Sequence, residues 1–190
     1  MDQEEINWTL VSIKICAVIF LVGLNGFFVA AEFALVKVRK TQLQPLLAKG
    51  HRRAKVAKHV INNLDAFLSA CQLGITLASL ALGWIGEPIF ETLLEPVYHW
   101  LHIESETLRT SLSFAVGFSV ITVLHIVIGE MAPKTMAIQK PLTTSLWVAY
   151  PMVWFYRATY PIVQALNWSS LLMLKMIGIQ SASESHDHHS

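Results

Sequence analysis

Three stretches of the sequence are long and apolar enough to cross a lipid bilayer. They cover residues 15–36, interrupted only by Glu32, residues 66–86 and residues 110–129. A spanning helix needs about 20 apolar residues, because each residue adds 1.5 Å across a hydrocarbon layer about 30 Å thick. The chain is only 14% charged, whereas soluble domains carry about 25% charged residues. We therefore predict an all-α integral membrane protein with three transmembrane helices.

The charged residues are segregated between the two loops that join these stretches. Eight of the fourteen Lys and Arg residues lie between Lys37 and Lys58, and five glutamates lie between residues 87 and 106, ahead of Arg109. The positive-inside rule places the basic loop in the cytoplasm. We therefore expect a multi-pass protein of the cell (inner) membrane, with an external N-terminus and a cytoplasmic C-terminus.

The next segment, residues 141–176, is apolar but is interrupted by Arg157 and three prolines, and it is rich in Trp and Tyr. Such aromatic side chains prefer the headgroup level of a membrane. We predict a kinked juxtamembrane helical belt in the cytoplasmic interface, with a tilted fourth span as the alternative. The predicted organisation is a transmembrane domain over residues 1–140, the belt over 141–178 and a flexible linker over 179–190.

Polar residues inside the spans form stripes at helical spacing. Close packing between helices explains most of them, since small and hydroxyl side chains hydrogen-bond across helix interfaces. We assign to packing the residues Thr76, Ser79, Ser119, Thr122 and His125.

Three other polar residues can be placed at one depth. Ser69 lies near the cytoplasmic end of the second span, and Glu130 lies at the same end of the third. Asn25 reaches that level if the first span begins near Trp8, which leaves Glu32 in a helical extension beyond the membrane. Each helix then offers an oxygen ligand at one level.

The Gly129 carbonyl is a fourth candidate ligand, because Pro133 has no N–H to donate to it four residues later. Carboxylate, amide, hydroxyl and carbonyl oxygens suit a hard cation such as Mg²⁺. These oxygens predict a cation site, although Glu130 as an ordinary interfacial acid is the competing interpretation.

Three motifs, in the same order, resemble the membrane domain of the CorC / cyclin M family of magnesium transporters. They are LNGFFVAAEFALVKVRK (24–40), LSACQLGITLASLALGWIGEP (68–88) and IGEMAPKTMAIQKP (128–141). The resemblance implies three transmembrane helices with a helical belt, a homodimer, and export of Mg²⁺ with Na⁺ as a coupling ion. It also implies cytoplasmic nucleotide-binding modules, which this sequence does not contain.

The resemblance assigns roles to individual residues. The expected metal ligands are Asn25, Ser69, Gly129 and Glu130, Gln72 is an expected supporting residue, and the structural residues of the GEMAPK motif are Pro133 and Lys134. Glu32 and Thr76 are expected as further supporting residues from their places on the polar stripes of the spans. The family often has a serine where this chain has Ala30 or Ala31, so no ligand is assigned there.

Two other functions compete with transport. The domain could be a membrane anchor and dimerisation module for cytoplasmic regulatory domains, although an anchor does not need polar residues at matched depth. An intramembrane hydrolase using Ser69 with His125 is disfavoured, because no glycine-rich nucleophile turn surrounds Ser69. We expect no enzymatic activity and no nucleic-acid partner.

Overall fold

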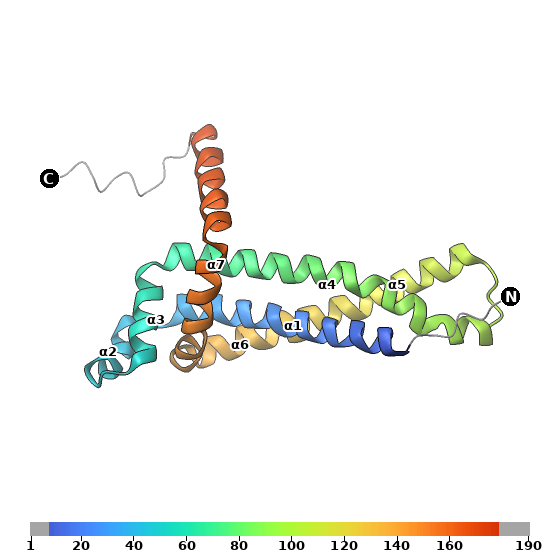
Figure 1. Ribbon diagram of the computed structural model, residues 1–190, viewed down its shortest axis with the longest axis horizontal. Helices are drawn as coiled ribbons and strands as arrows, with labels where there is room; N and C mark the ends of the chain where they lie inside the picture. Colours follow the sequence, from blue (N-terminus) through green and yellow to red (C-terminus); the bar gives the residue numbers. More distant parts are fainter. Residues whose placement is uncertain (1–7, 179–190) are drawn as a thin grey trace.

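The computed structural model describes residues 8–178, apart from the side chains of residues 87 and 88, and this part of the chain contains helices and no strands. Three long helical rods lie side by side along the molecule (Figure 1). They are α1 (Trp8–Lys37), α4 (Leu64–Trp100), and a rod made of α5 (Glu106–Leu124), the π-helix η1 (His125–Met131) and α6 (Ala132–Gln139). All three are long and apolar enough to span a membrane, which confirms the three predicted spans.

Two short helices, α2 (Lys40–Ala48) and α3 (Arg52–Asn62), join α1 to α4 at one end of the bundle. We call this the basic end, because α2, α3 and the loops beside them contain the basic residues between Lys37 and Lys58. The His51 side chain caps α3 by accepting a hydrogen bond from the Ala54 amide. At the opposite end the buried hydroxyls of Tyr98 and Ser113 lie 2.8 Å apart and join α4 to α5.

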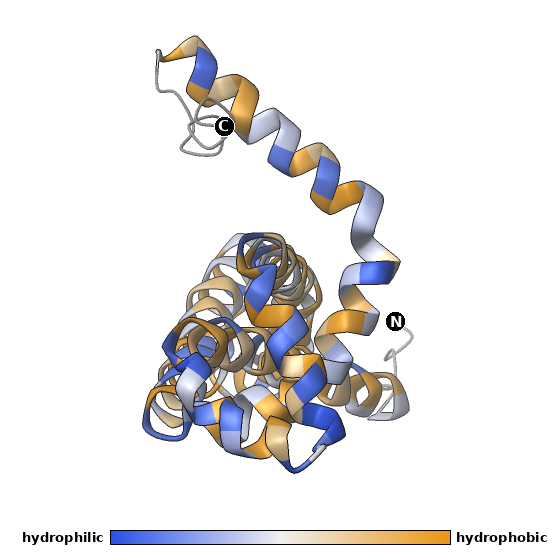
Figure 2. Ribbon diagram, turned by 90° about the vertical axis from the view of Figure 1, so that its left-hand side faces the viewer, coloured by the Kyte–Doolittle hydropathy of each residue, from blue (hydrophilic) through white to orange (hydrophobic). Residues whose placement is uncertain are grey.

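The last helix, α7 (Pro141–Met176), crosses the basic end of the bundle instead of running beside the spans (Figure 1). It packs on α1, α3 and α4 through Val163 and Asn167, and only its C-terminal end beyond them stands away from the bundle (Figure 2). It is not among the candidate spans of the described chain. This arrangement supports the belt over the fourth span. The helix continues through Pro151 and Pro161 without ending.

The hydrophobic core lies mainly at the basic end. Leu35 of α1, Leu43 of α2 and Val60 of α3 are almost fully buried there, together with Phe67 of α4 and Met152 of α7. Elsewhere the spans expose large apolar side chains such as Phe20 and Phe118, as expected for helices that face lipid. The predicted linker, 179–190, and residues 1–7 lie outside the described residues, and the division into domains stays a prediction.

Within the spans, glycines allow the helices to approach closely. A Cβ added to Gly74 of α4 would lie 2.6 Å from the ring carbons of Phe28 on α1, and one added to Gly117 of α5 would lie 2.8 Å from the ring of Phe90. In lipid, van der Waals packing between small residues replaces much of the hydrophobic drive that holds soluble helices together. The α1–α4 interface therefore depends on the missing side chain at Gly74.

We predict that Gly74→Ala destabilises the domain by about 1–3 kcal/mol, because the Phe28 ring cannot move aside within a packed interface. Gly83→Ala is the matched control: it lies on the same helix, and a Cβ there meets nothing within 4 Å. The stabilities of both variants are measured as the free energy of unfolding in mixed detergent micelles. Equal stability of the two variants would contradict the packing argument.

Candidate functional site

The side chain of Asn25 is buried in the middle of α1, with 1% of its surface exposed. Its Nδ2 donates a hydrogen bond of 2.9 Å to the Gly129 carbonyl of η1, and its Oδ1 accepts one of 3.3 Å from Ser79 Oγ of α4. One amide therefore links the three spans. We call Asn25, Ser79, His125 and Gly129 the inter-span cluster.

The π-helical turn presents the Gly129 carbonyl to Asn25. Pro133 stands four residues after Gly129 and has no N–H, so the α-helical donor to that carbonyl is missing. The turn from His125 to Met131 widens into a π-helix, a form that occurs often at functional sites. Asn25 supplies a donor from the neighbouring helix instead.

Two glycines make this approach possible. A Cβ on Gly129 would lie 3.3 Å from Asn25 Nδ2 and 3.0 Å from the His125 ring, and a Cβ on Gly26 would lie 2.9 Å from the Pro133 ring. The backbones of α1 and η1 therefore touch where the hydrogen bond forms. The Pro133 ring packs directly on α1, and its assignment as a structural residue of the motif stays a prediction.

From the sequence alone Ser79 and His125 are assigned to helix packing, and the structure places both in contacts between the spans, within the inter-span cluster. Ser79 Oγ lies 3.4 Å from His125 Nε2 as well as 3.3 Å from Asn25 Oδ1. Ser79 shares a helical stripe with Ser69, and nothing in the sequence indicates which of the two serines lies level with Asn25.

Ser69, by contrast, does not lie beside Asn25. Its hydroxyl is placed to donate to the Asp65 carbonyl and to Asn167 Oδ1 of α7, at 3.0 and 2.8 Å. It lies ten residues before Ser79, or about 15 Å along α4. The equal depth expected for Asn25 and Ser69 is therefore not found, because α1 continues for twelve residues beyond Asn25 toward the basic end. The role of Ser69 as a metal ligand stays a prediction.

The carboxylate of Glu130 is exposed, although the neighbouring Gly129 is buried in the bundle. The structure thus brings Asn25 and Gly129 together and leaves Glu130 on the outside of η1. The Glu130 carboxylate, which is the charged ligand of the expected site, therefore lies outside the inter-span cluster.

The expected supporting residues are also dispersed. Gln72 is exposed, and Thr76 Oγ1 donates to the Gln72 carbonyl within α4. Glu32 is half-buried, seven residues after Asn25. Lys134 places its Nζ 4.7 Å from the centroid of the Phe33 ring, a cation–π contact between α6 and α1. Its structural assignment stays a prediction.

The inter-span cluster offers oxygen ligands without charge. Asn25 Oδ1, Ser79 Oγ and the Gly129 carbonyl are hard donors that suit Mg²⁺ better than softer metals. Among the residues that the structure describes, no three His, Cys, Asp or Glu side chains come together to hold a metal ion.

Known proteins resemble this chain over most of its length. The family model described as "Cyclin M transmembrane N-terminal domain" matches residues 15–190. Relatives in Bacillus subtilis (strain 168) include the UPF0053 protein YugS, 46% identical over 172 residues, and the UPF0053 protein YrkA, 43% identical over 181 residues. These alignments cover 90% and 95% of this chain but only 40% and 42% of the relatives. The chain thus spans about two fifths of their length.

We predict that Asn25→Ala lowers the free energy of unfolding by about 1–2 kcal/mol. The change leaves the Gly129 carbonyl without its partner from α1, and an unpaired buried acceptor costs about 1–3 kcal/mol, although membrane hydrogen bonds average nearer 0.6 kcal/mol. Ser79→Ala should cost less, because its hydrogen bonds are longer, and the double variant should show less than the sum of the two losses.

The control is Ser119→Ala, whose hydroxyl donates to the Ala115 carbonyl of its own helix. It should leave stability nearly unchanged in the same detergent titration. A loss at Ser119 as large as that at Asn25 would show that the inter-span hydrogen bonds carry no special weight.

Proposed function

The chain belongs to the family of cyclin M transmembrane N-terminal domains, and on this premise we propose that it is the membrane part of a magnesium transporter. In this proposal the domain exports Mg²⁺ from the cytoplasm, with Na⁺ as the coupling ion. The ion passes through a site at the level of Asn25 and Gly129. No catalytic step is involved.

The buried amide of Asn25 is the observation that carries the proposal. A polar side chain inside a membrane is costly unless it faces protein or water, and such residues commonly mark an ion pathway. Asn25 lies where α1, α4 and η1 exchange hydrogen bonds, and its partner is a carbonyl that a proline has released from the helix. An ion that enters here replaces the Asn25–Gly129 hydrogen bond with two oxygen–metal bonds.

Glu130 supplies the charge in this proposal. Burial of a divalent cation among neutral groups is unfavourable in a low-dielectric site, and Mg²⁺ requires a dense set of oxygen ligands near 2.1 Å. Glu130 follows Gly129 directly, so a shift of the π-helical turn would carry its carboxylate from the surface of η1 toward Asn25. The α4 hydroxyl that would bind the ion is that of Ser69 according to the family resemblance. The contact with Asn25 favours Ser79 instead.

The remaining features of the proposal concern orientation and assembly. The basic end faces the cytoplasm by the positive-inside rule, so the ion enters from the side of α2, α3 and α7. Three helices cannot enclose a pathway easily, and we propose a homodimer in the cell membrane. The rest of the relatives' length would hold the cytoplasmic nucleotide-binding modules.

Calorimetric titration of the purified chain with Mg²⁺ tests the site. We expect saturable binding that Asn25→Ala and Glu130→Ala each weaken at least about tenfold, since the loss of one ligand to a charged group is worth roughly 1.5–3 kcal/mol. Ser119→Ala is the control and should bind as the parent does. Undiminished binding in the Asn25 and Glu130 variants would remove the site from this position.

The same titration decides between the two serines of α4. Ser79→Ala and Ser69→Ala make the same chemical change on one helix, about 15 Å apart along its axis. If the ion lies beside Asn25, Ser79→Ala should weaken binding and Ser69→Ala should not. The reverse result would place the ion nearer the basic end, at the level that the family resemblance implies.

A second candidate function is a membrane anchor and dimerisation module without transport of its own. The observation that favours it is that this chain aligns with only 40% and 42% of the length of two relatives. The activity of the whole proteins could reside in the remainder. Mg²⁺ flux in vesicles that contain only this chain distinguishes the two functions. Flux that Asn25→Ala abolishes supports transport, and binding-competent protein without flux supports the anchor.

A further inference from the structure

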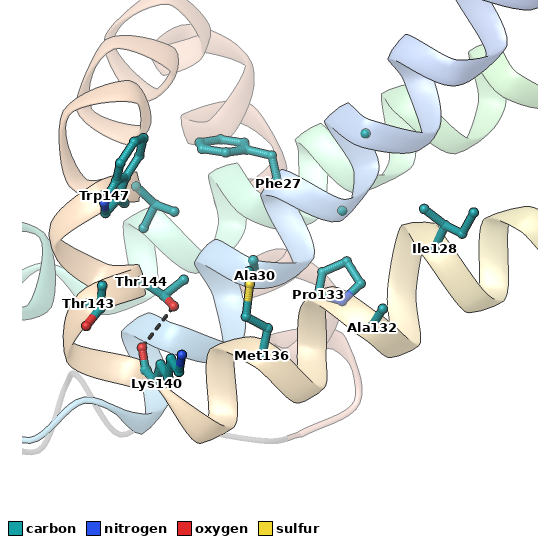
Figure 3. Close-up of a pocket in the computed structure, with 13 residues that line it drawn as sticks. Phe27, Ala30, Ile128, Ala132, Pro133, Met136, Lys140, Thr143, Thr144 and Trp147 are labelled. Carbon is teal, nitrogen blue, oxygen red and sulfur yellow. Dashed lines mark hydrogen bonds between the residues drawn. The ribbon is translucent and has the colours of Figure 1, made fainter.

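An apolar cavity of about 780 Å³ opens between α1, α6 and the start of α7 (Figure 3). Its size is that of a small-molecule or lipid-chain site. Its walls include Gly23 and Phe27 of α1, Pro133 and Met136 of α6, and Trp147 of α7. In Figure 3 the rings of Phe27 and Trp147 stand at one side of the cavity, and Lys140 lies with Thr143 and Thr144 at another.

A second, basic pocket of about 390 Å³ adjoins this cavity at the basic end of the bundle. It is lined by His51, Arg52 and Arg53, which lie at the start of α3, and by residues of α7. Thr143 and Trp147 line both pockets. The Arg53 guanidinium carbon lies 5.4 Å from the centroid of a Trp147 ring, so the basic group is held beside the tryptophan that borders the cavity.

The two pockets together have the polarity of a phospholipid. The larger cavity is apolar and is flanked by spanning helices, which suits an acyl chain. The smaller pocket is lined by Arg52 and Arg53, and Lys140 lines the larger cavity. Neither set of lining residues includes Asp or Glu, so the local charge favours an anion. Trp147 is 70% exposed between them, as expected for a side chain at the headgroup level.

We propose that this cavity and the adjoining basic pocket form a binding site for one anionic phospholipid. The acyl chain fills the apolar cavity against Gly23 and Phe27. The phosphate binds at Arg53, Arg52 and Lys140, a group of basic residues beside the spans of the kind that attracts acidic headgroups. A zwitterionic lipid of the same chain length fits the cavity but gains less from the arginines.

The site lies directly behind the inter-span cluster. Gly26 and Pro133 line the cavity, and a Cβ on Gly26 would lie 2.9 Å from the Pro133 ring and 3.7 Å from the Gly129 carbonyl. A lipid chain in the cavity therefore presses on the contact that holds α1 against η1. Its occupancy should stabilise that contact, whether or not the cluster binds a cation.

Native mass spectrometry of the chain, released from micelles that contain equal amounts of phosphatidylglycerol and phosphatidylcholine with identical acyl chains, tests the proposal. We expect the parent protein to retain one phosphatidylglycerol with a preference of at least about fivefold, the effect of one basic residue near an anionic headgroup. Equal retention of the two lipids would overturn the proposal, as would retention of inorganic phosphate in place of lipid.

Matched variants separate the headgroup from the chain. Arg53→Gln should reduce the preference for phosphatidylglycerol, whereas Lys55→Gln, an exposed change of the same charge on α3 outside both pockets, should not. Gly23→Leu should reduce the retention of both lipids by filling the cavity. Gly83→Leu is its control, since a Cβ at either glycine meets nothing within 4 Å and both variants should fold.

Two results of these variants would overturn the lipid site. The first is an equal loss of preference in Lys55→Gln and Arg53→Gln, which would mean that net charge alone attracts the lipid. The second is a change in the oligomeric mass of Gly23→Leu with unchanged lipid retention. That result would show that another copy of the chain covers the cavity.

Discussion

The hydrogen bond from Asn25 to the Gly129 carbonyl holds the spans of this protein in register. It forms inside a bundle that lipid surrounds, where no bulk water competes for either group. It requires a helix whose carbonyl has been released by Pro133, a π-helical turn that presents it, and two glycines that let the backbones touch. The same amide also binds α4, because Ser79 donates to its oxygen.

The two parts of the molecule are stabilised by different forces. At the basic end, apolar side chains from α2, α3 and α7 bury one another and are removed from water. Along the spans, lipid is as apolar as the side chains, so close contact at glycines such as Gly74 and a few hydrogen bonds decide the packing. The movement of the π-helical turn that the proposed cation site requires would therefore leave the core at the basic end intact.

The proposed cation and lipid sites lie on opposite sides of one helix contact. Asn25 reaches Gly129 on one side, and Gly26 meets Pro133 on the other, beside the apolar cavity. Both ligands would act on the distance between α1 and η1: a cation by replacing the hydrogen bond, and a lipid chain by supporting the packing behind it. This shared contact gives a physical route by which the membrane could influence the ion site.

The sequence alone determined the number of spans, because about 20 uncharged residues in succession have no other stable environment, and it indicated that the aromatic segment after Pro141 lies across their end. It also identified Asn25 and the Gly129 carbonyl as candidate ligands. An amide inside a span needs a polar partner, and Pro133, four residues after Gly129, has no N–H to donate to the Gly129 carbonyl. Only the tertiary structure decided that Ser79 stands beside Asn25 and that Glu130 lies outside the bundle. Helical periodicity defines the face on which a residue lies but not the axial register between helices. That register depends on where α1 and α4 end, and on the glycine contacts that fix their offset.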